Sequence, residues 1–273
     1  MRISTRVSDL LVLSIVAFNA MVGSARTIVA DEGWALAAGD LFGVSAVVWI
    51  ALGLAAFRLR QAAAKGQVPA WQALLVSILC LVPSAQVAWL AGTIYFLARL
   101  VQDRGNTAVP HAGLLIALAL CARTPVTWML TTLFAEPLLQ FDAVLAGWLA
   151  SQTTLIAGIE GNVVVHESGH RLFVMTGCSS WNNLSLALLF WFAMTRGLMA
   201  DGTRPPLWYP TMVGASVVLI NVARLSIMAR SPEAYHWLHD GDGAEIVLLL
   251  TAFTVGALTF FSLRGGRHAH PVA

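Results

Sequence analysis

Long apolar runs separated by short polar stretches dominate the chain and set the expected fold. A helix needs about 20 apolar residues to cross a bilayer of about 30 Å, and eight runs approach that length. The pattern therefore predicts an all-α polytopic membrane protein with about eight transmembrane helices, forming a single integral membrane domain over residues 1–273. The expected spans are residues 10–25, 34–57, 70–82, 86–100, 112–134, 181–195, 207–229 and 243–263.

The composition agrees with a membrane protein. Hydrophobic residues make up 58% of the chain and charged residues 11%, whereas soluble domains carry about 25% charged residues. The net charge of +2 is small and is spread along the chain, so a nucleic-acid partner is not expected. Residues 1–25 also have features of a signal peptide, but the apolar run that follows favours an uncleaved first span.

The distribution of basic residues predicts the orientation. Eight spans place both termini on one side, and most lysines and arginines then fall on that side, as cytoplasmic loops require. Counting residues 138–159 as a ninth span reverses the later loops and spoils this bias, so we expect that segment to be a helix lying at the membrane interface. The expected cytoplasmic residues are Arg2, Arg6, Arg58, Arg60, Lys65, Arg99, Arg104, Arg196, Arg204, Arg264 and Arg267, against Arg26, Arg171 and Arg230 outside.

A strand-like segment interrupts the helical pattern at residues 161–174. β-branched and apolar residues flank Ser168-Gly169 on both sides, which is typical of a hairpin with a two-residue turn. In the eight-span topology this hairpin is extracytoplasmic, and its second strand leads directly to Cys178.

Cys178 is the strongest candidate for chemistry. It lies just before the helix expected from Trp181, with Ser179 and Ser180 as possible caps. A thiol at a helix N-terminus is more easily ionised to the nucleophilic thiolate. Three cysteines form no evident disulfide framework, and Cys80 and Cys121 lie inside apolar runs as small hydrophobic residues.

Arg224 and His239 are expected near the same membrane face as Cys178. An arginine inside an apolar span is costly and marks a functional position, although snorkelling to the interface is an alternative. Asn221, three residues earlier on the same helical face, is expected to hold the guanidinium. His239 lies in an expected outside loop and has the side chain best suited to proton transfer near neutral pH. Arg123 is a second cation in a span, and its role stays open.

His166, Glu167 and His170 match the H-E-x-x-H pattern of zinc proteases. That pattern requires a helix, whereas the residues around it favour strands. In a hairpin with a Ser168-Gly169 turn, His166 pairs with Arg171, so His166 and His170 point to opposite faces of the sheet. We therefore expect no metal at this motif.

Taken together, these motifs resemble the exosortase/archaeosortase family of membrane-embedded cysteine transpeptidases. The family combines a Gly-rich strand-like segment, a Cys-Ser pair opening a span, an Asn-x-x-Arg near the end of the next span, and a His or Arg before the last. Here Cys178-Ser179, Asn221 with Arg224, and His239 occupy these places, and Ser180 stands where many members have glycine. The resemblance covers residues 112–263, the expected catalytic part. Residues 1–111, the N-terminal helical bundle part, are similar only in being helical.

The resemblance implies a reaction and partners. Cys178 would cleave the C-terminal sorting signal of a secreted protein through a thioester, and an unknown acceptor nucleophile would then receive the protein. Arg224 would stabilise the oxyanion or donate a proton, and His239 would act as base, acid or charge stabiliser. The family uses no metal or organic cofactor. The expected location is the bacterial cytoplasmic (inner) membrane, with the active site facing the extracytoplasmic side of the lipid bilayer.

Two other classes of function remain alternatives from the sequence. One is a zinc-dependent intramembrane metalloprotease that uses His166, Glu167 and His170. The other is a non-catalytic membrane transport or assembly protein.

Overall fold

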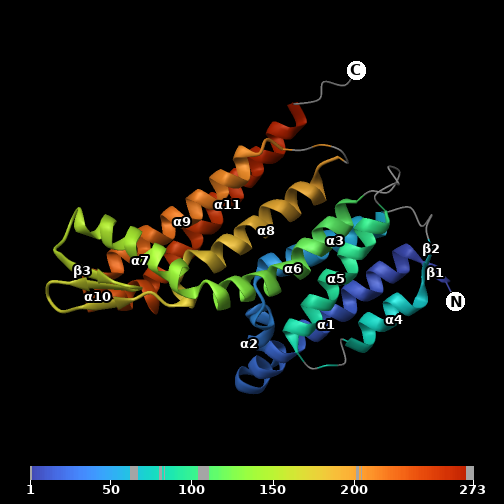
Figure 1. Cartoon of the computed structure of the whole chain (residues 1–273), viewed down its shortest axis with the longest axis horizontal. Helices are drawn as coiled ribbons and strands as arrows, with labels where there is room; N and C mark the ends of the chain where they lie inside the picture. Colours follow the sequence, from blue (N-terminus) through green and yellow to red (C-terminus); the bar gives the residue numbers. More distant parts are fainter. Residues whose placement is uncertain are drawn as a thin grey trace. The chain divides into compact units, whose positions relative to one another are not determined.

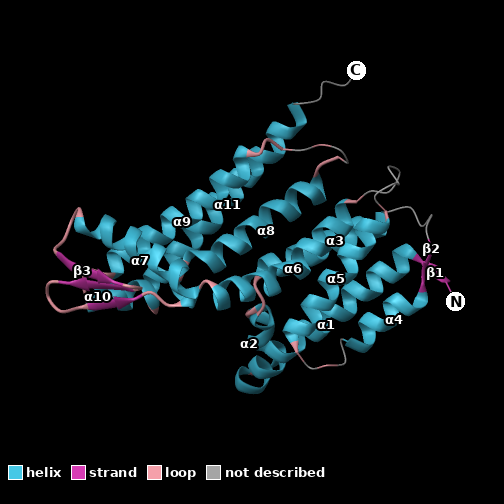
Figure 2. Cartoon of the chain, in the orientation of Figure 1, coloured by secondary structure: helices cyan, strands magenta, loops and turns pink. Residues whose placement is uncertain are grey.

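The computed structural model describes residues 2–61, 67–79, 82, 84–103, 111–200, 203 and 205–268. Most of these residues are helical, and short strands occur in two places (Figure 2). The chain forms two compact units. The first contains Met1–Val126 and Phe192–Arg204, and the second contains Thr127–Trp191 and Pro205–Ala273. Helices α6 (Ala112–Leu133) and α8 (Ser180–Leu198) each run from one unit into the other (Figure 1).

Helix α1 is the centre of the first unit. It packs against α5, α4 and α3, and its buried face includes Val12, Leu13 and Val16. Gly92 of α5 permits this close approach, because a Cβ at Gly92 would lie 3.0 Å from Val16 and 2.8 Å from the sulfur of Cys121. The elements of this unit are β1 (Arg2–Ser4), α1 (Thr5–Glu32), α2 (Trp34–Gly39), η1 (Leu41–Gly43), α3 (Ala46–Gln61), β2 (Gln67–Pro69), α4 (Ala70–Leu79) and α5 (Ala85–Gln102), with the larger part of α6.

Two charged residues are buried where the first unit packs α1 on α5. Arg99 Nε donates a hydrogen bond of 3.0 Å to Asp9, and the side chains of both residues are at most 5% exposed. Tyr95 donates a second hydrogen bond of 2.8 Å to the same carboxylate oxygen. Arg99 was expected among the cytoplasmic loop charges. Its place inside the packed unit means that it cannot be counted as evidence for the orientation of the chain.

The expected count of eight spans is wrong for this structure. Within the described residues, four helices are long and apolar enough to cross a membrane, judged by length and composition. These are Thr5–Glu32, Ala112–Leu133, Trp208–Met228 and Asp242–Gly266. The outer surface of the last of these helices agrees with contact to lipid, because only 17% of the apolar window of Asp242–Gly266 is buried by the protein itself. The chain is thus a helical protein with the features of a membrane-embedded one.

The run at residues 34–57 shows why the count fell. Instead of one long helix it contains α2, then η1, then α3 of 16 residues. Leu41 and Phe42 between them have φ angles of 51° and 58°, in the left-handed region that side chains with a Cβ rarely adopt. The break also contains Gly39, Asp40 and Gly43, which are turn-forming residues, but the apolar residues on both sides favoured a single span. Among the described residues, the run at residues 70–82 gives the helix α4, Ala70–Leu79.

The second unit joins helices to a small sheet. Helix α7 (Ala135–Ser151) ends well before residue 159, the end expected for the interfacial helix, and residues after it form a strand instead. The segment before the last helix, expected to be a loop, is the short helix α10. The elements are β3 (Ile156–Glu160), β4 (Val163–His166), β5 (Arg171–Phe173), η2 (Thr176–Cys178), most of α8, α9 (Trp208–Met228), α10 (Pro232–His239) and α11 (Asp242–His268).

The expected hairpin is confirmed, with a different register and an additional strand. Strands β3, β4 and β5 form an antiparallel sheet in chain order. Val165 pairs with Arg171, so the residues opposite each other at the turn are His166 and His170, and the turn contains Glu167 as well as Ser168 and Gly169. His166 N–H donates to the carbonyl of His170 at 2.9 Å. Gly169, with φ of 87°, supplies the left-handed residue that this wider turn needs.

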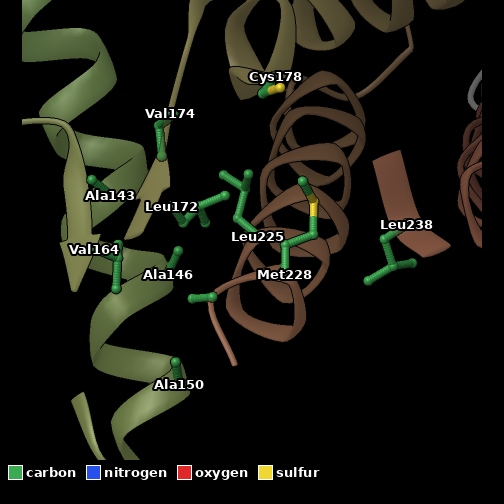
Figure 3. Close-up of a cluster of buried hydrophobic side chains, with 11 residues drawn as sticks. Ala143, Ala146, Ala150, Val164, Leu172, Val174, Cys178, Leu225, Met228 and Leu238 are labelled. Atoms are coloured by element: carbon green, nitrogen blue, oxygen red, sulfur yellow. The ribbon is translucent and has the colours of Figure 1, made fainter. Parts of the chain in front are cut away.

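A buried apolar cluster holds the sheet between two helices of the second unit. In Figure 3, Leu172 and Val174 lie between the alanines of α7 on one side and Leu225 and Met228 of α9 on the other. Small residues on α7 allow this packing, because a Cβ at Gly147 would come within 2.7 Å of Ile159 on β3. Cys178 and Leu238 belong to the same cluster. The core therefore brings the cysteine segment, α9 and α10 together.

Candidate functional site

Cys178 lies in the short connection between the sheet and α8. It is the last residue of η2, and α8 begins two residues later at Ser180. Its N–H donates to the carbonyl of Met175 at 2.9 Å, and Ser179 Oγ accepts a bond from Trp181 N–H at 3.2 Å. The residue is 7% exposed and carries a free thiol. The expected position just before a helix is confirmed, and the thiol is packed against the apolar cluster rather than open to solvent.

Asn221 contacts the Cys178 segment directly. Its Nδ2 donates one hydrogen bond of 2.9 Å to the carbonyl of Cys178 and another of 3.1 Å to Ser180 Oγ. We expected Asn221 to hold Arg224 through their shared helical face, but its amide is used across the interface between α9 and the start of α8. Asn221 is 3% exposed, so these bonds form away from water and fix α9 against the cysteine segment.

Asp142 is a residue at this site that the sequence did not single out. It lies on the packed face of α7 and is 3% exposed. Its two carboxylate oxygens accept bonds of 2.8 Å from the N–H and from the hydroxyl of Ser180. Burial raises the pKa of Asp142 above its ordinary value, and the two bonds from Ser180 lower it by less. The sequence signal for this residue was a charged aspartate within an otherwise apolar run. We had attributed it to the polar side of a helix at the membrane interface.

Arg224 lies on α9, one turn beyond Asn221, and holds the end of α10. Its Nε and Nη2 donate bonds of 3.1 and 2.9 Å to the carbonyl of Leu238. Leu238 lies in the last turn of α10, where carbonyl groups have no partner within the helix. A guanidinium there donates to a carbonyl that lacks a helical partner, and its positive charge interacts favourably with the negative end of the helix dipole. Nη1 takes no part in these two bonds.

His239 is the last residue of α10 and directly follows Leu238. Its Nδ1 lies 2.6 Å from a carboxylate oxygen of Asp240, and its ring stacks on Tyr235 with centroids 4.9 Å apart. The side chain is 28% exposed. A carboxylate at Nδ1 orients an imidazole and leaves Nε2 for proton transfer, as in hydrolase triads. Asp240 is a second residue that the sequence reading did not assign to the site.

These bonds connect the three candidate catalytic segments. Asn221 joins α9 to the carbonyl of Cys178, and Arg224, on the same helix, joins α9 to the residue before His239. Cys178, Arg224 and His239 all belong to the second unit. Their side chains are thus carried by elements that contact one another.

The histidines of the H-E-x-x-H motif are bound to separate partners. His166 Nε2 lies 2.7 Å from Thr154 Oγ1, and its Nδ1 lies 2.9 Å from Ser168 Oγ. His170 Nε2 lies 3.0 Å from the carbonyl of Met228 on α9. The expected pairing of His166 with Arg171 was wrong. In the observed register His166 and His170 are opposite each other, so the strand pairing does not direct their rings to different faces. The two rings instead bind different partners. Throughout the described part of the chain, no group of three His, Cys, Asp or Glu side chains is arranged to hold a metal ion.

Comparisons with known proteins define no family for this architecture. The chain matches no protein-family model, no curated protein and no solved structure.

Proposed function

We propose that the protein is a membrane-embedded cysteine peptidase or transpeptidase of the exosortase type, with Cys178 as its nucleophile. The observation that carries the proposal is the pair of hydrogen-bonded links from α9, one to Cys178 and the other to the residue before His239. An activated cysteine requires a base and an oxyanion donor within reach, and these links hold the segments that carry both.

The reaction has two steps. The sulfur of Cys178 attacks the carbonyl carbon of a peptide bond in the substrate's C-terminal sorting signal, while the thiol proton passes to Nε2 of His239. The tetrahedral oxyanion is stabilised by the guanidinium of Arg224 through Nη1. The C–N bond then breaks, His239 returns the proton to the leaving amine, and the acyl group remains on sulfur as a thioester. In the second step an acceptor nucleophile attacks the thioester carbon and gives its proton to His239. The C–S bond breaks, and the proton passes to the sulfur and restores the thiol.

The substrate is proposed to be a secreted protein whose C-terminal signal includes an apolar segment held in the bilayer. Four apolar helices in the enzyme itself support a membrane location. We propose the bacterial inner membrane, with the site on its extracytoplasmic side.

The first test is the requirement for Cys178. In membranes that contain the full chain and a co-expressed substrate with a C-terminal apolar signal, Cys178→Ala should abolish processing. Cys121→Ala is the matched control, because Cys121 is also buried but lies on α6 in an apolar helix. Wild-type protein should form an acyl adduct that hydroxylamine releases.

Two outcomes separate this proposal from the alternatives. Processing that continues in Cys178→Ala would exclude a cysteine peptidase and leave a non-catalytic role. Processing that stops with a chelator and requires His166 and His170 would instead identify a metalloprotease.

A further inference from the structure

The start of α8 is held by a buried charge from a different helix. Asp142 of α7 accepts both the backbone N–H and the hydroxyl of Ser180, each at 2.8 Å. Ser180 is the first residue of α8, and the first N–H groups of a helix have no partner within the helix. A carboxylate also interacts favourably with the positive end of the helix dipole. Asp142 thus caps α8 from across the packing interface.

The same bonds continue from Ser180 to the backbone of Cys178. An ionised carboxylate only accepts hydrogen bonds, so the Ser180 hydroxyl donates to Asp142 and its lone pair accepts the bond from Asn221 at 3.1 Å. The second hydrogen of the Asn221 amide binds the carbonyl of Cys178 at 2.9 Å. The N–H of Cys178 is bound to Met175. The N–H and the carbonyl of Cys178 are therefore both held by hydrogen bonds. The bond to the carbonyl comes from the Asn221 amide, which Ser180 and Asp142 orient.

We propose that Asp142 is a positioning residue for Cys178, acting through Ser180 and Asn221 to fix where the thiol is presented. The catalytic meaning of this role rests on the proposed function, in which Cys178 is the nucleophile. The hydrogen-bonded arrangement itself does not depend on which reaction occurs.

Energetics favour positioning over general stabilisation. Taking a carboxylate out of water is costly, and burial raises the pKa of Asp142 more than its bonds lower it. Because the pKa is raised, ionising Asp142 costs the folded protein more than it costs the unfolded chain, so the charge by itself does not stabilise the fold at neutral pH. Its two charge-assisted bonds instead fix the geometry of one residue, Ser180.

The test measures the reactivity of two cysteines in the same full-length, detergent-solubilised protein. N-ethylmaleimide is the probe, and alkylation is followed separately at Cys178 and Cys121 by peptide mass spectrometry. In the wild type both should react slowly, because Cys178 is 7% and Cys121 0% exposed. Asp142→Ala should release the Cys178 segment and raise its alkylation rate by about tenfold or more, the effect of losing charged hydrogen bonds. Cys121 should stay protected.

Conservative and control variants sharpen the result. Asp142→Asn keeps one acceptor oxygen for the two donors of Ser180, so its effect at Cys178 should lie between those of the wild type and Asp142→Ala. Ser180→Ala should also raise the rate, and combining it with Asp142→Ala should add little, because both act through the same bonds. Glu136→Gln is the matched control, since Glu136 is an exposed acid in the first turn of the same helix. Substrate processing should fall in the order in which Cys178 alkylation rises.

Other outcomes overturn the inference. Equal exposure of Cys178 and Cys121 in Asp142→Asn would show that Asp142 serves the global fold. An unchanged rate of Cys178 alkylation in Asp142→Ala would show that Asp142 does not position Cys178. Because alkylation needs no substrate, these results are independent of whether Cys178→Ala abolishes processing, which tests the proposed function.

Discussion

The guanidinium of Arg224 donates two hydrogen bonds, of 3.1 and 2.9 Å, to the carbonyl oxygen of Leu238. This contact gives Arg224 a structural role at the end of α10 in addition to its proposed role at the oxyanion. It also explains how a costly cation in an apolar helix is accommodated, because two of its nitrogens bind a carbonyl that lacks a helical partner. The two roles use different nitrogens of one planar group.

Arg224→Lys should lose most processing activity although it keeps the charge. A lysine can donate to Leu238 but cannot hold that carbonyl with two nitrogens and present a third to the substrate. Removal of one oxyanion donor reduces the rate by about 10²–10³-fold in related chemistry. The rate of substrate processing in membranes measures this. Arg230→Ala, an exposed arginine just beyond α9, should process normally. Normal processing by Arg224→Ala would remove the residue from the mechanism.

His239→Gln should reduce processing by about 10²–10⁴-fold, the usual contribution of a general acid or base. Asp240→Asn should have a smaller effect, because it weakens the bond to Nδ1 of His239 but leaves the imidazole in place. Single-turnover formation of the acyl adduct on Cys178 measures the first step separately. His236→Gln is the control, since its side chain is 74% exposed. An unchanged rate of adduct formation in His239→Gln would contradict its role as the base.

Asp9→Asn should destabilise the first unit strongly. It removes the carboxylate that accepts from Arg99 Nε and leaves Asp103, 3.0 Å from Nη2, as the remaining carboxylate partner of this buried arginine. Breaking one side of a buried ion pair costs up to about 3–5 kcal/mol. Thermal denaturation of the detergent-solubilised chain should show a clearly lower midpoint. Asp31→Asn, an exposed acid near the end of the same helix, should leave the midpoint unchanged. A midpoint equal to that of the wild type would mean that the Asp9–Arg99 pair adds no net stability.

The stability difference between the wild type and Asp142→Asn should depend on pH. The pKa of Asp142 is raised above its ordinary value of 3.8 in the folded state, with burial as the main cause. The folded protein thus binds this proton more tightly than the unfolded chain, so the residue's contribution to stability is greatest below that value and falls as pH rises through the raised pKa. Unfolding midpoints of both proteins should be measured from about pH 4 to about pH 7. As the pH rises, the wild type should lose stability relative to the variant. Parallel curves would contradict the raised pKa.

Most of the local elements could be predicted from the amino-acid pattern. Apolar runs correctly placed most of the helices, because a run of about 20 apolar residues has few stable alternatives in or near a bilayer. The β-branched residues around Ser168-Gly169 correctly predicted strands β4 and β5. The position of Cys178 just before a helix also followed from local signals, namely the glycine and serines around it. The catalytic roles of Cys178, Arg224 and His239 were also inferred from the sequence, and they stay predictions.

The lengths of the helices and the residues that act together depend on how the chain packs, which local sequence signals do not show. The break at Leu41 and Phe42 consists of two residues with left-handed backbone angles, which the apolar residues on both sides of it do not reveal. The hairpin register depended on a turn of three residues rather than two, and one residue of slip changes every cross-strand pair. Asp142 and Cys178 are distant in sequence and become linked through Ser180 and Asn221 only when α7, α8 and α9 pack. Such contacts arise from side chains meeting across helices, and no spacing along the chain encodes them.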